Sequence, residues 1–186
     1  MIILASKSSR RHKLLKNLKI NFKIVDSNFD ETSIKIKNPE KYCEKLSFLK
    51  ANAVSKIYQN DTIIAADTIV CINNKILEKP LNYKEAFNML KLLSGKIHYV
   101  YTGVTILANC KNITFSEMTE VKFFDLTDKE IKTYISNNNP YDKSGSYGIQ
   151  DGSLLFVDYI NGSYENVIGL PISKLYRILL KLNIIN

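Results

Sequence analysis

The sequence predicts one α/β domain over residues 1–186, in which helices flank a mixed, twisted sheet. Three observations lead to this fold class. The chain has 186 residues, a length at which one domain is expected and about 70% of the unfolded chain's surface can be buried. Hydrophobic residues make up 45% and charged residues 24% of the chain, as in globular proteins. Segments with helical periodicity alternate with apolar runs, some joined by hairpin signals, so parallel and antiparallel pairs should both occur.

The first elements are predicted from short apolar runs and helix-start residues. Ile2–Ala5 is a strand, a helix follows from about Ser8, and Phe22–Val25 is a second strand. Asn38 and Pro39 start a long helix, because proline is favoured at the first helical position. Six apolar residues at helical spacing are expected to form its buried face: Tyr42, Leu46, Leu49, Ala53, Val54 and Ile57.

The middle of the chain is predicted to begin with a hairpin. Two apolar runs within residues 62–80 flank Asp67, which we place at a strand end, and Asn73 with Asn74 favours a hairpin turn. The segments that follow are a helix and two strands: 82–93, 99–108 and 113–124.

The last third is predicted to hold two helices separated by a loop and a strand. Thr127 begins the first helix, with Glu130 as its partner in a capping box. The predicted helix, loop, strand and closing helix are 127–135, 137–150, 154–160 and 172–182. No internal repeat or linker divides the chain, so we expect a single α/β domain. That domain could be folded as two lobes.

Charge and cysteine content narrow the function classes. The net charge of +8 is compatible with a phosphate-bearing ligand. Because the lysines are spread along the chain and form no block, the charge does not choose between nucleic acid and nucleotide. Cys43, Cys71 and Cys110 lack disulfide or zinc spacing and are expected to be small buried residues in a reducing compartment. No segment resembles a signal peptide or membrane span, so a cytoplasmic protein is expected.

The segment LASKSSRR, Leu4 to Arg11, is a candidate anion site. Ser6, Ser8, Arg10 and Arg11 would combine a helix N-terminus, hydroxyl groups and guanidinium groups around a phosphate. A capping serine followed by solvated cations also explains these residues. The segment alone leaves both interpretations open.

Asp67 is the most informative acidic residue, because it interrupts an apolar run. Burial of a carboxylate is costly unless it is compensated, although an aspartate that caps a turn is also common. Mg²⁺ typically binds one or two carboxylates plus phosphate oxygens. Glu31 and Asp67 would supply the carboxylates, while Lys50, Lys79 and the two arginines would neutralise a triphosphate. This set is typical of a metal-assisted phosphoryl or nucleotidyl hydrolase.

Other catalytic patterns fit poorly. The sequence near Gly95 and Lys96 lacks the spacing of a P-loop. His12 and His98 share no metal-ligand spacing, which argues against zinc. His98 could donate a hydrogen bond to a site, but we expect a structural, hydrogen-bonded histidine.

Several segments occur in the order and spacing of one family. They are LASKSSRRHKLL, Asp30-Glu31, LKANA, AADTIV, Lys79-Pro80, SGKIHYVYTGV, TEVKFF, DKSGSYGIQ and GSYENVIGLP. With these segments the whole chain resembles the Maf family, nucleoside triphosphate pyrophosphatases that were historically linked to septum formation and are similar in fold to inosine triphosphatases. The resemblance implies two lobes around a central cleft, a divalent metal (Mg²⁺ or Mn²⁺), and a homodimer. Ser9, where the family usually has proline, and Asn139, where glutamate is frequent before Pro140, depart from the pattern.

The resemblance also assigns roles to residues. Glu31 and Asp67 match the acidic pair that holds the metal, with Asp67 as proton acceptor, and Lys50 and Lys79 match phosphate-binding lysines that act in catalysis. The residues that match the phosphate- and base-binding motif are Ser6, Ser8, Arg10 and Arg11.

Three positions bear on the base. Arg10, Thr68 and Gln150 match the subgroup that hydrolyses dTTP and UTP, and an amide such as Gln150 can both donate to and accept from a pyrimidine. The alternatives are the same reaction on a modified nucleotide such as 7-methyl-GTP, or a non-catalytic protein that binds nucleic acid or a division partner. Nucleic acid is the less favoured ligand, because a polyanion binder gains nothing from Glu31 and Asp67. The sequence leaves open whether the protein cleans the nucleotide pool or restrains division.

Overall fold

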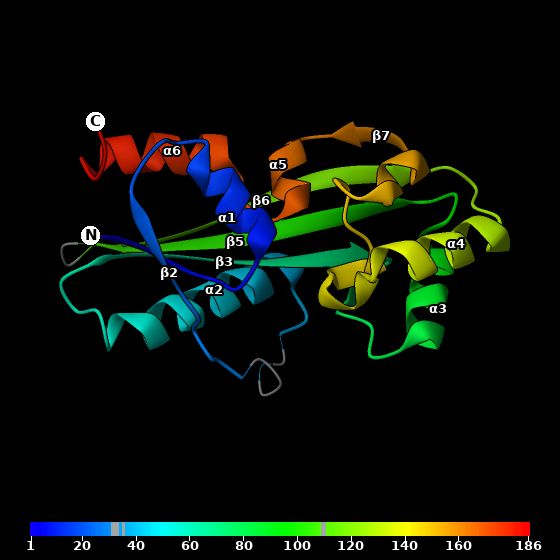
Figure 1. Ribbon diagram of the computed structural model, residues 1–186, viewed down its shortest axis with the longest axis horizontal. Helices are drawn as coiled ribbons and strands as arrows, with labels where there is room; N and C mark the ends of the chain where they lie inside the picture. Colours follow the sequence, from blue (N-terminus) through cyan, green and yellow to red (C-terminus); the bar gives the residue numbers. More distant parts are fainter. Residues whose placement is uncertain (31–33, 35, 109–110) are drawn as a thin grey trace. The chain divides into compact units, whose positions relative to one another are not determined.

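The computed structural model describes residues 1–30, 34, 36–108 and 111–186. Within these residues it confirms a mixed α/β fold with one seven-stranded sheet and flanking helices (Figure 1). The strands are β1 (Ile2–Ala5), β2 (Phe22–Val25), β3 (Thr62–Ile72), β4 (Lys75–Leu77), β5 (Ile97–Ala108), β6 (Lys111–Phe123) and β7 (Val157–Asn161). The helices are α1 (Ser9–Lys16), α2 (Pro39–Ser55), α3 (Tyr83–Leu93), α4 (Asp128–Asn138), α5 (Tyr164–Ile168) and α6 (Ile172–Lys181).

The sheet combines parallel and antiparallel pairs in the order β2-β1-β3-β5-β6-β7, with β4 paired to β3. β1 is parallel to both of its neighbours, with Ile2 opposite Phe22 of β2 and opposite Thr62 of β3. β3 and β4 form the predicted hairpin, and both Asn73 and Asn74 have positive φ, as a type I′ turn requires. The chain divides into two compact units, in agreement with the two predicted lobes.

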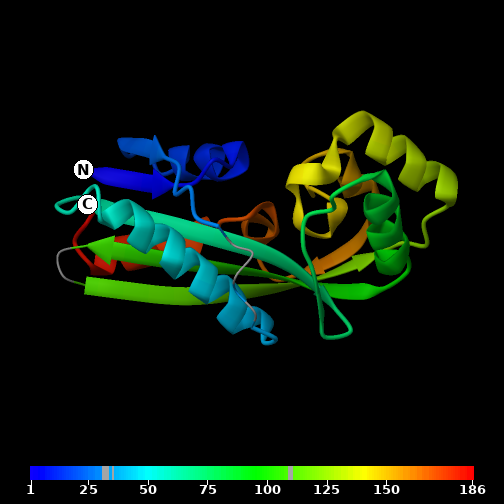
Figure 2. The ribbon, with the colours of Figure 1, turned by 90° about the horizontal axis from the view of Figure 1, so that it is seen from below.

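The first unit comprises Met1–Asp67, Thr102–Glu117 and Gly169–Asn186. In this unit α2 and α6 lie on opposite faces of the strands (Figures 1 and 2). Alternation along β3 turns Ile63 and Ala65 toward the same face. They pack there with Ala51 and Val54 of α2, and the members of this small core are Ile3, Ala5, Ala51, Val54, Ile63 and Ala65.

The second unit comprises Thr68–Tyr101 and Met118–Ile168. Its core is larger and lies between α3, α4 and the strands, with an aromatic centre in which Phe123 makes edge contacts to His98, Tyr147 and Phe156. The predicted capping box of α4 is confirmed: Thr127 Oγ1 accepts from the amide of Glu130, whose carboxylate accepts from the amide of Thr127.

Three details of the sequence prediction are wrong. Asp67 lies inside a continuous strand, because its charge is paired with a lysine of α2 and β3 continues unbroken beyond it. The strand expected from residue 154 begins at Val157, since residues 152–156 form a 3₁₀ turn that leaves Leu154 54% and Leu155 84% exposed. Ile57 is 74% exposed because α2 ends at Ser55.

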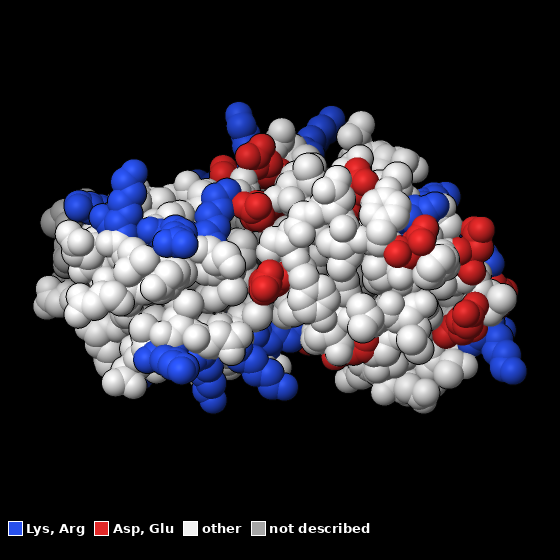
Figure 3. All heavy atoms as spheres, turned by 90° about the horizontal axis from the view of Figure 1, so that it is seen from above, with Lys and Arg blue, Asp and Glu red and all other residues white. Residues whose placement is uncertain are grey.

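Two further features were not predicted, α5 and the short 3₁₀ turns within the loop after α4. Among the described residues, none of the helices combines the length and apolarity needed to cross a bilayer. Basic side chains form several separate groups on the face drawn in Figure 3, with acidic side chains elsewhere on it.

Candidate active site

The N-terminal segment forms a compact turn between β1 and α1. Ser8 caps α1, and its hydroxyl accepts from the amide of Arg11 at 3.4 Å. The hydroxyl of Ser6 accepts from the amide of Ser8 at 3.2 Å and from Nη1 of Arg11 at 3.4 Å. The first turn of α1 contains no acidic residue. The capping interpretation is therefore confirmed for Ser8, and the turn concentrates positive charge at the N-terminus of α1, while the anion site stays a prediction.

Arg11 is anchored from a distant part of the chain. Its Nε donates to the carbonyl oxygen of Gly169 at 2.8 Å. His12 also contacts this turn, because its Nε2 lies 2.7 Å from the carbonyl oxygen of Ser6. Arg10, half-buried on the same helix, completes the pair of guanidinium groups. The predicted group of Ser6, Ser8, Arg10 and Arg11 thus lies on one turn, although its bonds to His12 and Gly169 were not predicted.

Asp67 and Lys50 form a buried ion pair. Lys50 Nζ lies 2.5 Å from Asp67 Oδ1, and the two residues are 8% and 7% exposed. Strand alternation explains the contact: Asp67 follows Ile63 and Ala65 on the face that packs against α2, and Lys50 directly precedes Ala51 of that helix. Burial of two opposite charges is tolerated only as a pair, so each residue holds the other in place.

Hydrogen bonds and a close approach fix α2 against the strands. Ser47 Oγ lies 2.9 Å from Thr105 Oγ1 of β5, which lies 2.9 Å from Thr114 Oγ1 of β6. A Cβ at Gly103 would lie 2.4 Å from the carbonyl carbon and oxygen of Cys43, so only glycine permits this approach of helix and strand. These contacts fix the position of α2 on the sheet and therefore the position of Lys50 relative to Asp67 of β3.

The end of β1 lies level with Asp67 along the sheet. The parallel register pairs Leu4 with Ile64, so the chain leaves β1 beside residues 65–67 of β3. Ligands of open α/β sheets bind beyond the carboxyl ends of parallel strands. The first unit therefore places a cationic helix start and a buried carboxylate at the same level of two neighbouring strands.

The remaining predicted residues are distributed differently. Lys79, Thr68 and Gln150 belong to the second unit. Ser144 Oγ donates to the carbonyl oxygen of Thr68 at 2.9 Å. The amide of the next residue, Gly145, donates to the carbonyl oxygen of Glu78 at 3.1 Å. These adjacent bonds hold Thr68 near the residue that precedes Lys79.

Glu31, the second carboxylate of the predicted acidic pair, lies outside the described residues. Lys79 and Gln150 are exposed, as ligand-binding side chains require.

Comparison with known proteins decides the family. The family model described as Maf-like protein matches residues 1–182. This chain belongs to the Maf family. A dTTP/UTP pyrophosphatase of Thermosipho africanus (strain TCF52B) is 52% identical over 178 residues, which cover 96% of this chain and 91% of the relative. A dTTP/UTP pyrophosphatase of Bacillus cereus (strain AH187) is 48% identical over 183 residues, covering 98% and 96%.

A solved structure supports the fold of this Maf-family chain. A HAM1 protein from Coxiella burnetii superposes with a TM-score of 0.54 at 12% sequence identity, covering 97% of this chain and 98% of that one. At this identity the likeness concerns the fold alone.

Two predictions for this Maf-family chain are confirmed where the residues are described: His98 is a structural, hydrogen-bonded histidine, and the cysteines are buried. His98 is fully buried and its Nε2 lies 2.8 Å from the hydroxyl of Tyr147, while burial lowers the pKa of His98 to about 4. Cys43 and Cys71 are buried, and burial raises the pKa of both thiols. Cys110 lies outside the described residues.

Lys143 is the buried cation that sequence analysis missed. It stands within the quoted segment DKSGSYGIQ, is 7% exposed, and contacts two aspartates. The available signal was a lysine beside small residues and an aspartate, Asp142, in an otherwise polar loop. Such a pattern is too common to indicate burial.

Proposed function

We propose that this chain hydrolyses dTTP and UTP to the nucleoside monophosphate and pyrophosphate. The observation that carries the proposal is the buried pair of Lys50 and Asp67 at the level of the cationic start of α1. A protein that only binds polyanions has no use for a buried carboxylate beside its phosphate site. The names of the two relatives, at 52% and 48% identity, support the reaction and the pyrimidine substrates.

In this proposal Asp67 acts as the base. Its carboxylate accepts a proton from the water whose oxygen attacks the α-phosphorus, and the bond from that phosphorus to the bridging oxygen of the β-phosphate breaks. Lys50 orients the carboxylate through the 2.5 Å contact. The hydroxyl groups of Ser6 and Ser8, with both arginines of α1, bind the triphosphate and offset its charge.

Residues of the second unit complete the proposed substrate contacts. Lys79 binds a phosphate through its exposed ammonium group. Arg10, from the first unit, together with Thr68 and Gln150, contacts the carbonyl oxygens and ring N–H of a pyrimidine. A site that relies on such hydrogen bonds discriminates strongly against a base whose pattern does not match.

We also propose a divalent cation, Mg²⁺ or Mn²⁺, as cofactor. No cluster of three metal-ligating residues occurs among the residues the structure describes, which exclude Glu31. The chemistry of the donors fits Mg²⁺, which commonly takes one or two carboxylates and completes its shell with phosphates. Asp67 and Glu31 would hold the ion, which when bound would polarise the phosphate and offset its negative charge.

A screen of nucleoside triphosphates for pyrophosphate release tests the function. We expect dTTP and UTP to be hydrolysed faster than dGTP, ATP or 7-methyl-GTP. Faster hydrolysis of 7-methyl-GTP would keep the reaction and overturn the base assignment. Release of no pyrophosphate from any nucleotide, together with DNA binding at physiological salt, would favour the non-catalytic alternative.

Assembly and cellular context follow from the family resemblance. We propose that residues 1–186 act as one catalytic domain, in the cytoplasm, and that the chain forms a homodimer. The match of the family over residues 1–182 supports the single domain. Light scattering measures the mass of the assembly directly; a mass of one chain, 21.3 kDa, would exclude the dimer.

A further inference from the structure

Lys143 ties together the two ends of the loop that follows α4. Its Nζ contacts the carbonyl oxygen of Asn139 at 3.2 Å, Asp142 Oδ1 at 2.8 Å and Asp151 Oδ2 at 3.4 Å. These partners precede and follow the lysine in the sequence. The lysine side chain is 8% exposed, whereas that of Asp142 is 64% exposed. A single buried ammonium group therefore fixes both ends of the segment 139–151.

Three side chains of this loop converge over Gly148. A Cβ at that position would lie 2.7 Å from Asp151 Oδ2, 2.8 Å from Lys143 Cε and 2.9 Å from Gln150 Nε2. The stem of the lysine and the amide of Gln150 thus pack over the same backbone. The turn beneath them is closed by the amide of Asp151, which donates to the carbonyl oxygen of Gly148 at 2.8 Å. Gln150 stands inside this turn, next to the ion-paired Asp151.

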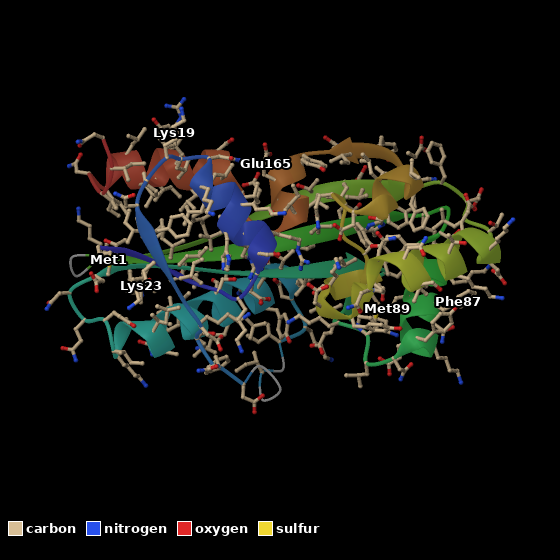
Figure 4. The ribbon with its side chains drawn as sticks, in the orientation of Figure 1. Met1, Lys19, Lys23, Phe87, Met89 and Glu165 are labelled. Carbon is tan, nitrogen blue, oxygen red and sulfur yellow. The ribbon has the colours of Figure 1, made fainter. Side chains whose placement is uncertain are left out.

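The backbone below the turn is also bound to the rest of its unit. The amide of Gly148 donates to the hydroxyl of Tyr134 at 3.1 Å, and Ser153 Oγ donates to the carbonyl oxygen of Gly148 at 2.7 Å. Ser146 Oγ lies 3.3 Å from Met89 Sδ of α3, the helix on which Figure 4 labels Met89 and Phe87. The middle of the loop is therefore anchored without Lys143, and the lysine acts on the two ends of the loop, next to one of which Gln150 lies.

We propose that Lys143 is a positioning residue for base selection: through Asp151 and the packing over Gly148 it holds the amide of Gln150 in one orientation. The inference rests on the proposed function, in which Gln150 contacts the base. An amide selects a hydrogen-bond pattern only when its orientation is fixed, because a freely rotating amide presents donor and acceptor to either pattern. Two aspartates already surround the ammonium group, so its charge is balanced inside the protein and is unsuited to binding a phosphate.

The experiment compares kcat/KM for dTTP with kcat/KM for dGTP in wild type and variants. Lys143→Met keeps the length of the stem and removes the ammonium group. We expect the dTTP to dGTP ratio to fall about tenfold, a typical result of misplacing one selecting group. Lys143→Arg, which keeps the charge, should restore most of the ratio. The matched control is Lys91→Met, which removes an exposed ion pair with Asp128 in the same unit and should leave the ratio unchanged.

A double-mutant cycle with Gln150→Glu separates positioning from a general structural role. If Lys143 acts through Gln150, Lys143→Met should change the ratio little once Gln150 has been replaced. A ratio that Lys143→Met leaves intact, with only the melting temperature lowered, would overturn the inference. So would an equal loss of kcat/KM for both nucleotides.

A second variant covers the case in which Lys143→Met does not fold, and measurements on the wild type distinguish failure of this inference from failure of the proposed function. If Lys143→Met does not fold, Asp151→Asn decides in its place, because it weakens the same contact from its other partner: a lowered ratio supports the inference, and an unchanged ratio overturns it. A wild-type protein without pyrophosphate release, or without pyrimidine preference, would instead refute the proposed function.

Discussion

Asp67 combines two roles that a single substitution can separate. In Asp67→Asn the amide oxygen can still accept a hydrogen bond from Lys50, so the chain should still fold, although at lower stability, because the buried ammonium group loses its counter-charge. The proton acceptor is lost. We expect kcat for dTTP with saturating Mg²⁺ to fall about a thousandfold, within the range typical of general-base removal. Circular dichroism checks the fold. Asp128→Asn, which removes the carboxylate of an exposed ion pair, is the control. An Asp67→Asn variant that kept most of its activity would show that Asp67 is not the base.

His98 makes stability depend on pH. Burial lowers its pKa from 6.5 to about 4 in the folded protein, so the unfolded chain binds more protons between these values. The contribution of the neutral His98 side chain to the free energy of unfolding is therefore fully present above pH 6.5 and is lost as the pH falls toward 4. The shift corresponds to about 3 kcal/mol of unfolding free energy at most. Denaturant unfolding across this window measures it.

The control variant for the pH dependence of stability is His98→Gln, whose side chain cannot gain a charge in acid. Its unfolding free energy should fall less steeply than that of wild type over the same pH range, whatever its absolute stability. Equal slopes for the two proteins would assign the acid sensitivity to other groups. His12, half-buried on α1, remains in both proteins and so does not affect the comparison.

At the scale of elements, the position of α2 decides where Lys50 meets β3. In Gly103→Ala the new methyl group would meet the backbone of Cys43 at 2.4 Å and the amide of Glu44 at 2.5 Å, and backbone cannot rotate away as a side chain can. Overpacking of this kind costs about 1–3 kcal/mol. We expect a lowered denaturation midpoint together with reduced kcat.

The control for this prediction is Gly152→Ala. The atoms nearest to a Cβ there belong to the side chain of Asn138, at 3.2 Å, and a side chain can shift by a few tenths of an ångström, so little change is expected. If Gly103→Ala had wild-type stability and activity, the close approach of α2 to β5 would not be what positions Lys50.

At the scale of the whole molecule, the net charge of +8 separates catalysis from non-specific binding. Binding to duplex DNA that relies on dispersed lysines should weaken steeply between about 50 and 200 mM salt. The proposed chemical step relies on Asp67 and Lys50, which are buried, and on the half-buried arginines of α1, and salt screens such groups less than exposed lysines. We expect pyrophosphate release at saturating dTTP to persist over this range while DNA binding is lost. Salt titrations of pyrophosphate release and of DNA binding, carried out in parallel, test this expectation. DNA binding that persists at a salt concentration where hydrolysis is lost would support a nucleic-acid role.

The sequence determined the local elements of this protein and the identity of its chemical groups. The strands Ile2–Ala5 and Phe22–Val25, the capped starts of α2 and α4, and the Asn73-Asn74 hairpin follow from propensities and caps that act over a few residues. The acidic and basic residues proposed for the site were recognised from their types and from the motifs around them.

Only the tertiary structure decided which of these groups meet. Asp67 pairs with Lys50, seventeen residues away in the sequence, because α2 packs over β3. That Lys143 is buried depends on two aspartates brought together by the loop, and the exposure of Leu154 depends on a turn where alternation suggested a strand. A short segment of sequence indicates which backbone conformation its own residues prefer. Burial and charge pairing depend instead on residues that lie far from that segment in the sequence.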